Sequence, residues 1–455
     1  MASNLNFQHY PRVLFVTPHA FNGVTGGGIS FSALFREWPK DCLATVHNDS
    51  EPVTHNVCDT YFKLTRREID LVWPLNLFRR SQSGASHKSA VASTATPQPT
   101  SFWHRTKRAI RSLILSVTGQ LPPDRGTLST ELREWIASYK PEVLYTILGT
   151  NGMMDLISAI QREFDLPLVV HFMDDWPSDY YRDGLLAPYS RARMNTHLNK
   201  LVGIAAQRMA ISPAMEKAYT ERFGHPFEAF QNTIDVSKWS RLAKEDSGPV
   251  SKPSEILYVG SIFANAQLES LVECAELVAE MSDEGRDVRL RIASPSGHAQ
   301  IYQQRLKVSD AIEIEDTIRD DDTFFGRLAD ADLLLLPVNF EAETIRFIRY
   351  SMPTKVPAYL ASGTPILAYG PSGTAQIDYA VETGWATVVD TPGKSRLSDG
   401  FERALFELDL RRRTAQAGLN AARQNHDSSH IRTLFQARLQ SLAPAAKDIS
   451  ARKKF

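Results

Sequence analysis

The chain has 455 residues, of which 43% are hydrophobic and 23% are charged, with a formal net charge of -1. A chain of this length exceeds what one hydrophobic core usually organises, so we expect two domains. The near-zero charge excludes a globally basic nucleic-acid binder, and we expect no nucleic-acid partner. Three scattered cysteines are too few for a disulfide framework or a zinc site. No apolar run approaches the about 20 residues that span a bilayer, so the expected location is the cytoplasm.

Apolar runs alternate with helical patterns through the first half of the chain. Residues 12–17, RVLFVT, are apolar without alternation, as expected of a parallel strand covered on both faces. A glycine-rich loop over 25–28 follows, and the next helix is expected to bury Ile29, Leu34 and Phe35. The remaining predicted elements of this half are strands at 143–147 and 167–172, and helices at 155–164 and 192–206.

A second series of strands and helices starts at residue 256. Its strands are predicted at 256–260, 288–293, 311–314, 333–337 and 365–369. Residues 241–253 lie in a polar stretch without a clear apolar period and are predicted to be an interdomain linker. The pattern predicts an α/β protein of two facing, doubly wound Rossmann-like domains with parallel sheets. The predicted limits are 1–240 for the first domain, 254–427 for the second, and 428–455 for a last helix and tail.

The segment 81–125 interrupts this alternation and is predicted to hold a mobile loop and a basic amphipathic helix. Its first part is rich in Ser, Thr, Ala and Pro, a composition typical of mobile loops. Its second part, 102–117, combines an apolar helical stripe with a basic cluster, as helices at anionic membrane surfaces do. A surface helix that faces its own core shows the same stripe. The stripe is Ile110, Leu113, Ile114 and Val117, and the basic residues are Arg105, Lys107, Arg108 and Arg111.

The stretch 351–371, SMPTKVPAYLASGTPILAYGP, predicts a helix whose start can bind an anion. Ser351 and Thr354 are residue types that cap helix starts, and Gly363 is expected to end the helix before a buried strand. The unpaired N–H groups and the dipole of a helix start attract negative charge, and Lys355 adds a full positive charge. The alternative is an ordinary helix packed beside an ordinary strand.

Residues 171–176, HFMDDW, close a predicted strand and contain the candidate catalytic side chains His171, Asp174 and Asp175. Such groups are costly to bury, so at a strand end they are usually partnered or functional. The alternative is that one aspartate caps a helix while Trp176 packs at the domain edge. No third ligand is evident, so no metal site is predicted.

Glycines follow the first strand of each half. Gly27 and Gly28 allow a phosphate or sugar to approach the backbone closely. Gly260 allows the same approach in the second half, and Ser261 offers a hydroxyl. The alternative is that these glycines serve only tight turns. The dinucleotide fingerprint GxGxxG is not met, which argues against a nicotinamide enzyme.

Together these stretches resemble the GT-B glycosyltransferases, particularly the nucleotide-sugar-dependent family 4 group of bacterial polysaccharide and glycolipid synthesis. The resemblance implies that 254–427 holds the nucleotide sugar, that 1–240 holds the acceptor, and that a helix in 430–442 crosses back to the first domain. The motifs that carry it are Gly26 to Gly28, HFMDDW, AISPAMEKAYTERFG leading to AFQNTIDVSKW, YVGS, ADADLLLLP and SMPTKVPAYLASGTPILAYGP.

The resemblance also implies partners and residue roles. The donor would be a nucleotide diphosphate sugar, the acceptor a saccharide or lipid-linked saccharide, and the transfer would retain the anomeric configuration. No cofactor is implied and no metal is strictly required. The residues that would contact the donor sugar or its diphosphate are Gly27, Gly28, Gly260, Ser261, Ser351, Thr354 and Lys355.

Three departures from the family pattern leave other functions open. The family usually has an Arg and a Lys after the glycine that corresponds to Gly260, where this chain reads GSIFANAQ, and Arg346 or Arg349 can replace these cations. A ribose-binding Glu of the family is Ala358 here, and a sugar-binding Glu is Tyr350. A second hypothesis is therefore a catalytically degenerate binding or scaffold protein. A third is a sugar-phosphate epimerase or another GT-B enzyme without an acceptor.

Overall fold

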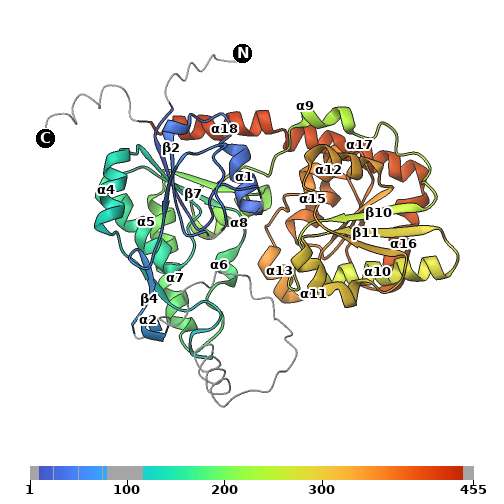
Figure 1. Cartoon of the computed structure of the whole chain (residues 1–455), viewed down its shortest axis with the longest axis horizontal. Coiled ribbons are helices and arrows are strands. Elements are labelled where there is room, and N and C mark those ends of the chain that lie inside the picture. Colours follow the sequence, from blue (N-terminus) through green and yellow to red (C-terminus); the bar gives the residue numbers. More distant parts are fainter. Residues whose placement is uncertain (1–9, 24, 50, 74, 79–115, 444–455) are drawn as a thin grey trace.

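The computed structural model describes residues 10–23, 25–49, 51–73, 75–78 and 116–443. Two α/β domains lie side by side, the first blue to green and the second yellow to orange in Figure 1. Each domain is built on a parallel sheet with helices packed against it. The prediction of two facing α/β domains with parallel sheets is confirmed, while the residue limits of the domains stay predictions.

The first sheet has seven parallel strands in the order β3-β2-β1-β6-β7-β8-β9. Every residue of β1, β2 and β7 is buried, because helices cover both faces. The strands are β1 Val13–Thr17, β2 Leu43–His47, β3 Thr60–Lys63, β6 Val143–Thr146, β7 Leu168–Phe172, β8 Gln207–Ala210 and β9 Glu228–Ala229.

The second sheet has six parallel strands in the order β12-β11-β10-β13-β14-β15. The predicted strands of both halves agree with the observed ones to within two residues at each end. The strands are β10 Ser254–Val259, β11 Val288–Ala293, β12 Ile312–Glu315, β13 Leu333–Pro337, β14 Ile366–Tyr369 and β15 Thr387–Val389.

Helices connect these strands and cover the sheets. In the first domain they are α1 Gly26–Leu34, α2 Leu75–Phe78, α4 Thr130–Tyr139, α5 Asn151–Phe164, α6 Trp176–Asp179, α7 Ala187–Ile204 and α8 Pro213–Phe223, with the 3-10 turn η1 Lys40–Cys42. From the domain junction onward they are α9 Val236–Trp239, η3 Ser240–Leu242, α10 Leu268–Asp283, α11 Ser296–Leu306, α12 Asp321–Asp330, α13 Ala342–Ile348, α14 Val356–Ala361, α15 Ala375–Thr383, α16 Lys394–Phe406, α17 Leu408–Asn425 and α18 Ser428–Gln440.

The chain crosses between the domains twice at one place. The Ile234 N–H donates to the His426 carbonyl at 2.8 Å, and the Ser428 N–H donates to the Ile234 carbonyl at 2.9 Å. Beyond this point α18 packs on α1, where the Gln436 amide donates to the Arg36 carbonyl at 2.9 Å. The two crossing segments are hydrogen-bonded to each other, so a movement of one domain relative to the other must displace both segments together.

Two local predictions in the first domain were wrong. The three glycines form the first turn of α1 instead of a loop before it, because Thr25 caps the helix by accepting from the Gly28 N–H. Ile29 is 45% exposed, whereas Leu34 and Phe35 are buried as predicted. The buried residues of α1 are Gly28, Ser30, Phe31 and Leu34, so Ile29 lies outside the buried face.

The end of the segment 81–125, which was predicted to hold a mobile loop and a helix, has a different structure from the predicted one. Residues Asp124–Gly126 form β5, which pairs antiparallel with β4, Ile69–Leu71. Asp124 is buried there because its carboxylate accepts hydrogen bonds from the Gly152 N–H and the Thr150 hydroxyl at the start of α5. The predicted membrane-binding helix at 102–117 lies outside the described residues except for 116 and 117.

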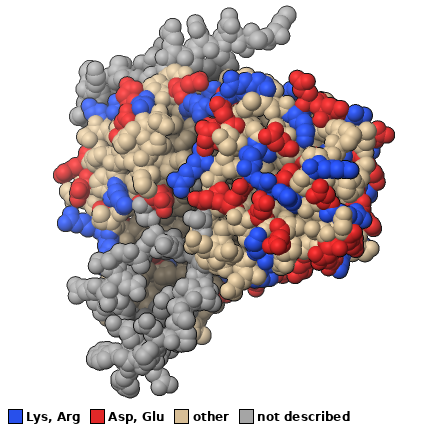
Figure 2. Space-filling view, turned by 45° about the vertical axis from the view of Figure 1, so that its right-hand side comes forward, with Lys and Arg blue, Asp and Glu red and all other residues tan. Residues whose placement is uncertain are grey.

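The described part of the chain contains no helix long and apolar enough to cross a membrane. Figure 2 shows Lys and Arg side chains interspersed with Asp and Glu over the visible face of the second domain. Such mixing produces no extended field of one sign on that face.

Candidate functional site

The strand orders place one topological switch point in each sheet. In the first sheet the order reverses between β1 and β6, and in the second between β10 and β13. Ligands of open α/β sheets bind outside the carboxyl ends of the strands at such points. The chain leaves β1 toward the glycines of α1 and leaves β10 at Gly260. Both predicted glycine sites therefore lie where the topology opens a crevice.

Lys355 is the main cationic group of the second domain at this crevice. Its Nζ lies 3.9 Å from the centre of the Tyr258 ring. It forms no ion pair or hydrogen bond with any described residue, and burial lowers its pKa to about 7. A half-buried ammonium without a carboxylate is costly unless a ligand supplies the negative charge.

Gly260 keeps the space beside Lys355 open. Its φ is +129°, a conformation that residues with a side chain rarely adopt, and a Cβ here would lie 3.6 Å from the Lys355 Nζ. The following loop is held by Gln267, whose amide donates to the Ser261 carbonyl and to the Tyr258 hydroxyl. A ligand can thus approach both the cation and the backbone at 260–261.

The helix after Lys355 starts later than the sequence predicts. α14 begins at Val356 with Lys355 as its N-cap, and no side chain caps it. Thr354 is exposed and Ser351 is half-buried in the preceding loop, so neither hydroxyl takes the predicted capping role. Gly363 follows the helix with a φ of +72°, which confirms the predicted helix end. A helix this short has only a small dipole, so the attraction for an anion at this place comes mainly from the charge of Lys355.

The start of α1 faces this loop from the first domain. A Cβ on Gly26 would lie 3.4 Å from the Thr354 Cγ2, so the two segments are almost in contact. Gly28 is covered by the Asn22 side chain, whose Oδ1 a Cβ would approach to 2.5 Å. The first N–H groups of the helix, at Gly26 and Gly27, have no carbonyl of their own helix to pair with. Of the two predicted glycines of α1, Gly27 is half-buried and Gly28 is buried, so Gly27 is the more accessible to a ligand.

Polar contacts tie this loop to the first domain. The Asn232 amide donates to the Met352 carbonyl at 2.7 Å, and its oxygen accepts from the Ser30 hydroxyl of α1 at 2.6 Å. The Ser212 hydroxyl donates to the Tyr350 carbonyl at 2.8 Å. These bonds fix the backbone just before Lys355 against the first domain.

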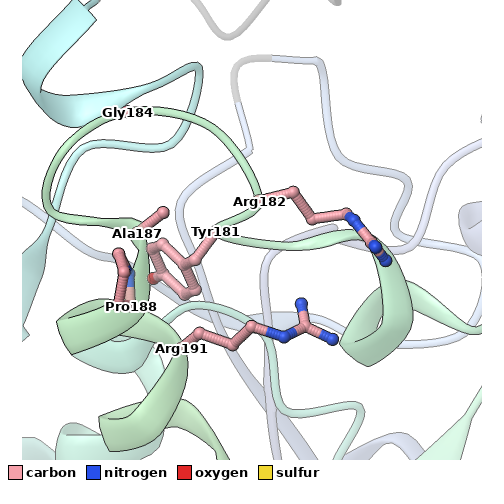
Figure 3. Close-up of a pocket in the computed structure, with 6 residues that line it drawn as sticks. All are labelled: Tyr181, Arg182, Gly184, Ala187, Pro188 and Arg191. Carbon is pink, nitrogen blue, oxygen red and sulfur yellow. The ribbon is translucent and has the colours of Figure 1, made fainter.

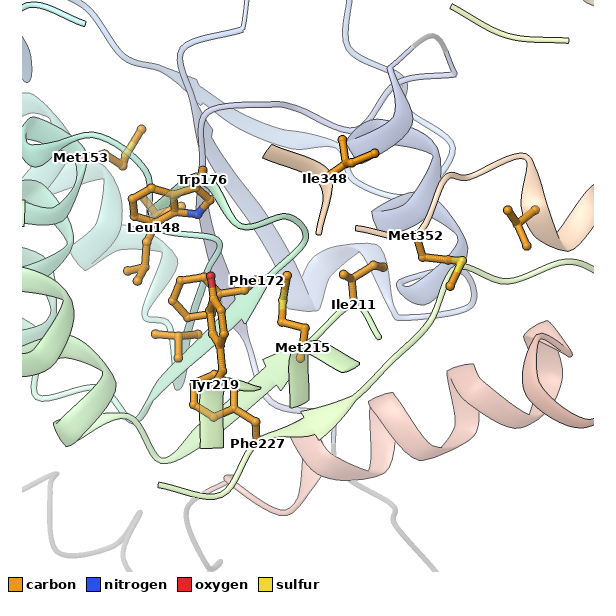
Figure 4. Packing of buried hydrophobic residues seen from close by; sticks show 14 of the residues in the cluster. Leu148, Met153, Phe172, Trp176, Ile211, Met215, Tyr219, Phe227, Ile348 and Met352 are labelled. Atoms are coloured by element: carbon orange, nitrogen blue, oxygen red, sulfur yellow. The ribbon is translucent and has the colours of Figure 1, made fainter. Parts of the chain in front are cut away.

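An apolar cluster continues across the same boundary. Figure 4 shows Ile348 and Met352 of the second domain beside Met215, Ile211 and other buried side chains of the first. The departure from the family pattern at Tyr350 has a structural reason here. Its ring packs 6.3 Å from that of Tyr219 across the boundary, where a carboxylate would be buried among aromatic rings.

His171 lies inside β7 with no exposed surface. The Tyr145 hydroxyl is 2.6 Å from its Nδ1, and aromatic rings of Phe31, Tyr145 and Phe230 surround it. Burial lowers its pKa to about 3, so the imidazole is neutral. In this arrangement His171 does not reach the crevice, and its predicted catalytic role has no geometric support.

The two aspartates after β7 differ from each other. Asp175 is 4% exposed, and its Oδ1 accepts from the Tyr219 hydroxyl at 2.7 Å and lies 3.6 Å from an Arg222 nitrogen. Asp174 is half-buried, and its one hydrogen bond with a described residue comes from the Trp176 N–H at 3.1 Å, while burial raises its pKa to about 6. The structure therefore leaves Asp174 as the available carboxylate. Asp175 precedes α6 and is bonded to side chains of α8, so its role agrees with the structural alternative that the sequence analysis left open.

The two arginines that could replace the missing cations lie in and after α13. Arg346 faces the first domain, with its Nε 3.7 Å from the Asp179 carboxylate of α6. Arg349 is exposed, its guanidinium is 5.7 Å from the Tyr350 ring, and its carbonyl accepts from the Ala375 N–H. Neither guanidinium contacts Lys355 or Gly260 in this structure. Their donor-binding roles stay predictions.

Two buried polar residues that follow strands of the second domain were not selected from the sequence. Ser294 follows β11 with no exposed surface, and its hydroxyl has no partner among the described residues. Asn339 follows β13, is 1% exposed, and its amide donates to the Ala264 carbonyl in the loop after Gly260. Their position just after strands was the signal that could have identified them.

No cluster of three or more His, Cys, Asp or Glu side chains that could hold a metal ion occurs in the described segments. This observation does not test the prediction that no cofactor is needed.

Comparison with known proteins gives structural matches only. No protein-family model matches the chain, and no curated protein sequence matches it significantly. The chain is similar in structure to a sucrose-phosphate synthase from Thermosynechococcus elongatus, with a TM-score of 0.59, 12% identity, and coverage of 95% of this chain and 99% of that one. Both chains align over nearly their whole length, so the similarity covers both domains and their mutual arrangement. The chain has the GT-B fold.

Two further GT-B proteins support this assignment. An α,α-trehalose-phosphate synthase (UDP-forming) from Burkholderia vietnamiensis matches with a TM-score of 0.59 and 14% identity, covering 95% of this chain and 99% of that one. Anabaena HepE in complex with UDP-glucose matches with a TM-score of 0.56 and 11% identity, covering 94% and 99%. At such identities the comparisons establish the GT-B fold, and the chemistry must be argued from this chain's own residues.

Proposed function

We propose that this protein is a glycosyltransferase that transfers a sugar from a nucleotide diphosphate sugar to a saccharide or lipid-linked acceptor. The observation that supports the proposal is the half-buried Lys355 ammonium, which lies beside Gly260 and has no anionic partner in the part of the chain that the structure describes. Its place at the switch point of the second sheet fits a diphosphate better than a neutral ligand.

The donor diphosphate would lie between Lys355 and the start of α1. In this proposal, Lys355 supplies a positive charge from the second domain. The N–H groups of Gly26 and Gly27, at the start of α1, supply hydrogen-bond donors from the first domain. Because Gly26 almost touches Thr354, a diphosphate in the crevice would contact both domains at once.

The departing nucleoside diphosphate gains negative charge as the bond to the sugar breaks. A fixed cation and fixed backbone donors stabilise this charge without having to reorganise. Asp174, on the first domain, is the carboxylate that would assist the acceptor hydroxyl or the oxocarbenium-like sugar. Retention of configuration stays a prediction from the family resemblance.

The donor class receives support from one of the structural neighbours. HepE forms complexes with UDP and with UDP-glucose. We therefore infer a uridine nucleotide as the first donor to test, and polysaccharide or glycolipid synthesis as the setting. The cytoplasm is the proposed compartment, and the three cysteines without disulfides are compatible with it.

Calorimetry with UDP, GDP, ADP and CMP, followed by turnover assays with the sugars of the nucleotides that bind, tests the proposal. A ligand at 100 times its dissociation constant should stabilise the protein by about 2.7 kcal/mol, so a thermal-shift panel gives a rapid first answer. Absence of binding to every nucleoside diphosphate would sink the proposal.

The second candidate is a binding or scaffold protein that has lost catalysis. It is favoured by the loop after Gly260, which carries no Arg or Lys in GSIFANAQ. Nucleotide binding without turnover of any sugar donor would support this candidate, whereas turnover of one donor would remove it.

Association with an anionic membrane through 102–117 remains a separate proposal from the sequence. Replacing Arg105, Lys107, Arg108 and Arg111 with Ser should lower binding to anionic liposomes, since each basic residue near such a surface contributes about 1 kcal/mol. Unchanged sedimentation with the liposomes would contradict it.

A further inference from the structure

A cavity of about 290 Å³ lies on the first domain at the beginning of α7. Its wall combines two arginines with apolar and small residues, as Figure 3 shows. The two long side chains extend in the same direction, and their guanidiniums lie close to each other. The lining residues are Tyr181, Arg182, Gly184, Ala187, Pro188 and Arg191.

Backbone carbonyls hold both arginines in place. Arg182 donates to the Ser178 carbonyl at 2.6 Å, and Arg191 donates to the Tyr180 carbonyl at 2.9 Å. Neither forms an ion pair with a carboxylate among the described residues. Each guanidinium has five N–H donors, so several stay available to a ligand.

Two more arginines add to the positive charge around Arg191. Burial lowers the pKa of Arg191, repulsion by Arg182, Arg222 and Arg346 lowers it further, and Asp175 offsets part of this. Arg222 and Arg346 are compensated by Asp175 at 3.6 Å and by Asp179 at 3.7 Å, respectively. Asp174, which follows β7, has a pKa raised to about 6 by burial, and the Asp124 carboxylate accepts from the Tyr181 hydroxyl at 3.3 Å. Asp175 also attracts Arg191, but neither Arg182 nor Arg191 forms an ion pair within the described residues.

The chain segment that lines the cavity also carries two exposed side chains with large apolar parts. Leu185 is 78% exposed and Tyr189 is 64% exposed. A cationic cavity near such side chains suits a ligand that has a phosphate at one end and an apolar part at the other.

We propose that Arg182 and Arg191 form a subsite for a phosphate group carried by the acceptor substrate. The inference rests on the proposed function for its acceptor role. The cavity is on the domain proposed to hold the acceptor. The charge of Arg346, which belongs to the second domain and lies 3.7 Å from Asp179 of α6, also acts on Arg191. A phosphate held here would orient the rest of the acceptor toward the crevice.

The experiment compares the double variant Arg182→Gln/Arg191→Gln with wild type and with Arg208→Gln. Arg208 is a matched control, because burial also lowers its pKa and its guanidinium also donates only to backbone carbonyls, those of Val202 and Gly203. Binding of geranyl phosphate, glucose 6-phosphate and inorganic phosphate is measured by calorimetry in the presence of saturating UDP. If UDP does not bind, the titrations are repeated in a Lys355→Ala background, so that no probe occupies the donor cation.

The expected result is a loss of phosphate-probe affinity of at least about 30-fold in the double variant, since two charge-assisted contacts disappear. Affinity for UDP should stay unchanged, which separates this proposal from the proposed donor site. Geranyl phosphate binding more tightly than glucose 6-phosphate would identify a lipid phosphate as the source, and the reverse order would identify a phosphorylated sugar.

Equal losses in Arg208→Gln and in the double variant would overturn the proposal, as would unchanged probe affinity in the double variant. Thermal midpoints are compared first. If the double variant fails to fold, Arg182→Gln alone is used, because the Arg182 side chain is exposed and its loss leaves the core intact. The single variant should still lose about tenfold in affinity for the phosphate probes, because one charge-assisted contact disappears.

Discussion

The segment HFMDDW at a strand end of the first domain and the segment SMPTK before a helix of the second were both selected from the sequence as candidate sites, yet the fold uses them differently. In the first, Tyr145 bonds to the Nδ1 of the fully buried His171 and Tyr219 bonds to Asp175, whereas Asp174 is half-buried and accepts from the Trp176 N–H. In the second, Lys355 has no anionic partner among the described residues.

The difference shows how a fold separates structural from functional polar groups. A buried polar group with a good partner is already satisfied and adds specificity to the packing. One that is half-buried and unpaired costs free energy in the empty protein, and a ligand of opposite charge recovers it. Lys355, which has no anionic partner among the described residues, and Asp174, which accepts one backbone hydrogen bond, are the two charged groups on which the proposed reaction site rests.

The largest expected effect concerns the available carboxylate. Asp174→Asn should lower turnover at least about 100-fold, the usual contribution of a positioned acid or base. Burial raises the pKa of Asp174 to about 6, so the carboxylate form is lost as pH falls below that value and wild-type turnover should fall with it. Steady-state rates between pH 5 and 8, with Asp283→Asn as an exposed control, check this. An unchanged rate in Asp174→Asn would remove the distinction between the two aspartates.

The donor cation should produce the next largest effect. Lys355→Met should weaken UDP binding by up to about 100-fold, since a charge-assisted hydrogen bond contributes about 1.5–3 kcal/mol. Lys394, which pairs with Glu280 on the surface, provides the control Lys394→Met. Calorimetry measures both. Equal affinities in the two variants would mean that the ammonium of Lys355 is not what the nucleotide recognises.

A substitution of His171 tests whether this buried side chain has a structural role and no catalytic one. His171→Ala should destabilise the protein by about 2–3 kcal/mol, because it creates a cavity and leaves the Tyr145 hydroxyl unpaired. Urea unfolding measures the loss. UDP affinity of the folded variant should equal that of wild type, and a specific loss of turnover without a loss of stability would restore a catalytic role.

The pH dependence of nucleotide binding sharpens the role of Lys355. Its pKa is lowered to about 7 in the empty protein, so the amine is mostly neutral at pH 8, whereas a bound diphosphate favours the charged form. Binding at pH 8 should therefore take up nearly one proton, and affinity should fall by up to about tenfold per pH unit above 7. Calorimetry in two buffers of different ionisation enthalpy counts the proton. Lys355→Arg, charged at every pH used, should show no uptake.

The smallest effect is expected at the tie between the domains. Asn232→Ala should cost about 1 kcal/mol of stability by removing the bonds to Met352 and Ser30. It should also weaken UDP binding slightly, because the backbone before Lys355 loses its support. Thermal unfolding with and without UDP detects both changes. A stability equal to wild type would show that the apolar contacts at Ile348 and Met352 hold the boundary alone.

The sequence determined the architecture because its signals are local. Apolar runs such as 12–17 and 333–337 must be strands covered on both faces, and their order along the chain implies two parallel sheets. Gly260 and Lys355 could be selected from their positions after a strand and before a helix. These inferences need only the near neighbours of each residue in the sequence.

Tertiary structure decided which polar residues are available. That His171 is enclosed by rings, that Asp175 is bonded to Tyr219, and that Arg346 pairs with Asp179 all depend on residues far away in the chain. The grouping of Arg182 with Arg191, Arg222 and Arg346 arises in the same way. Sequence pattern places a polar group at the end of a strand, but only the packing of other segments decides whether it is buried, paired or left for a ligand.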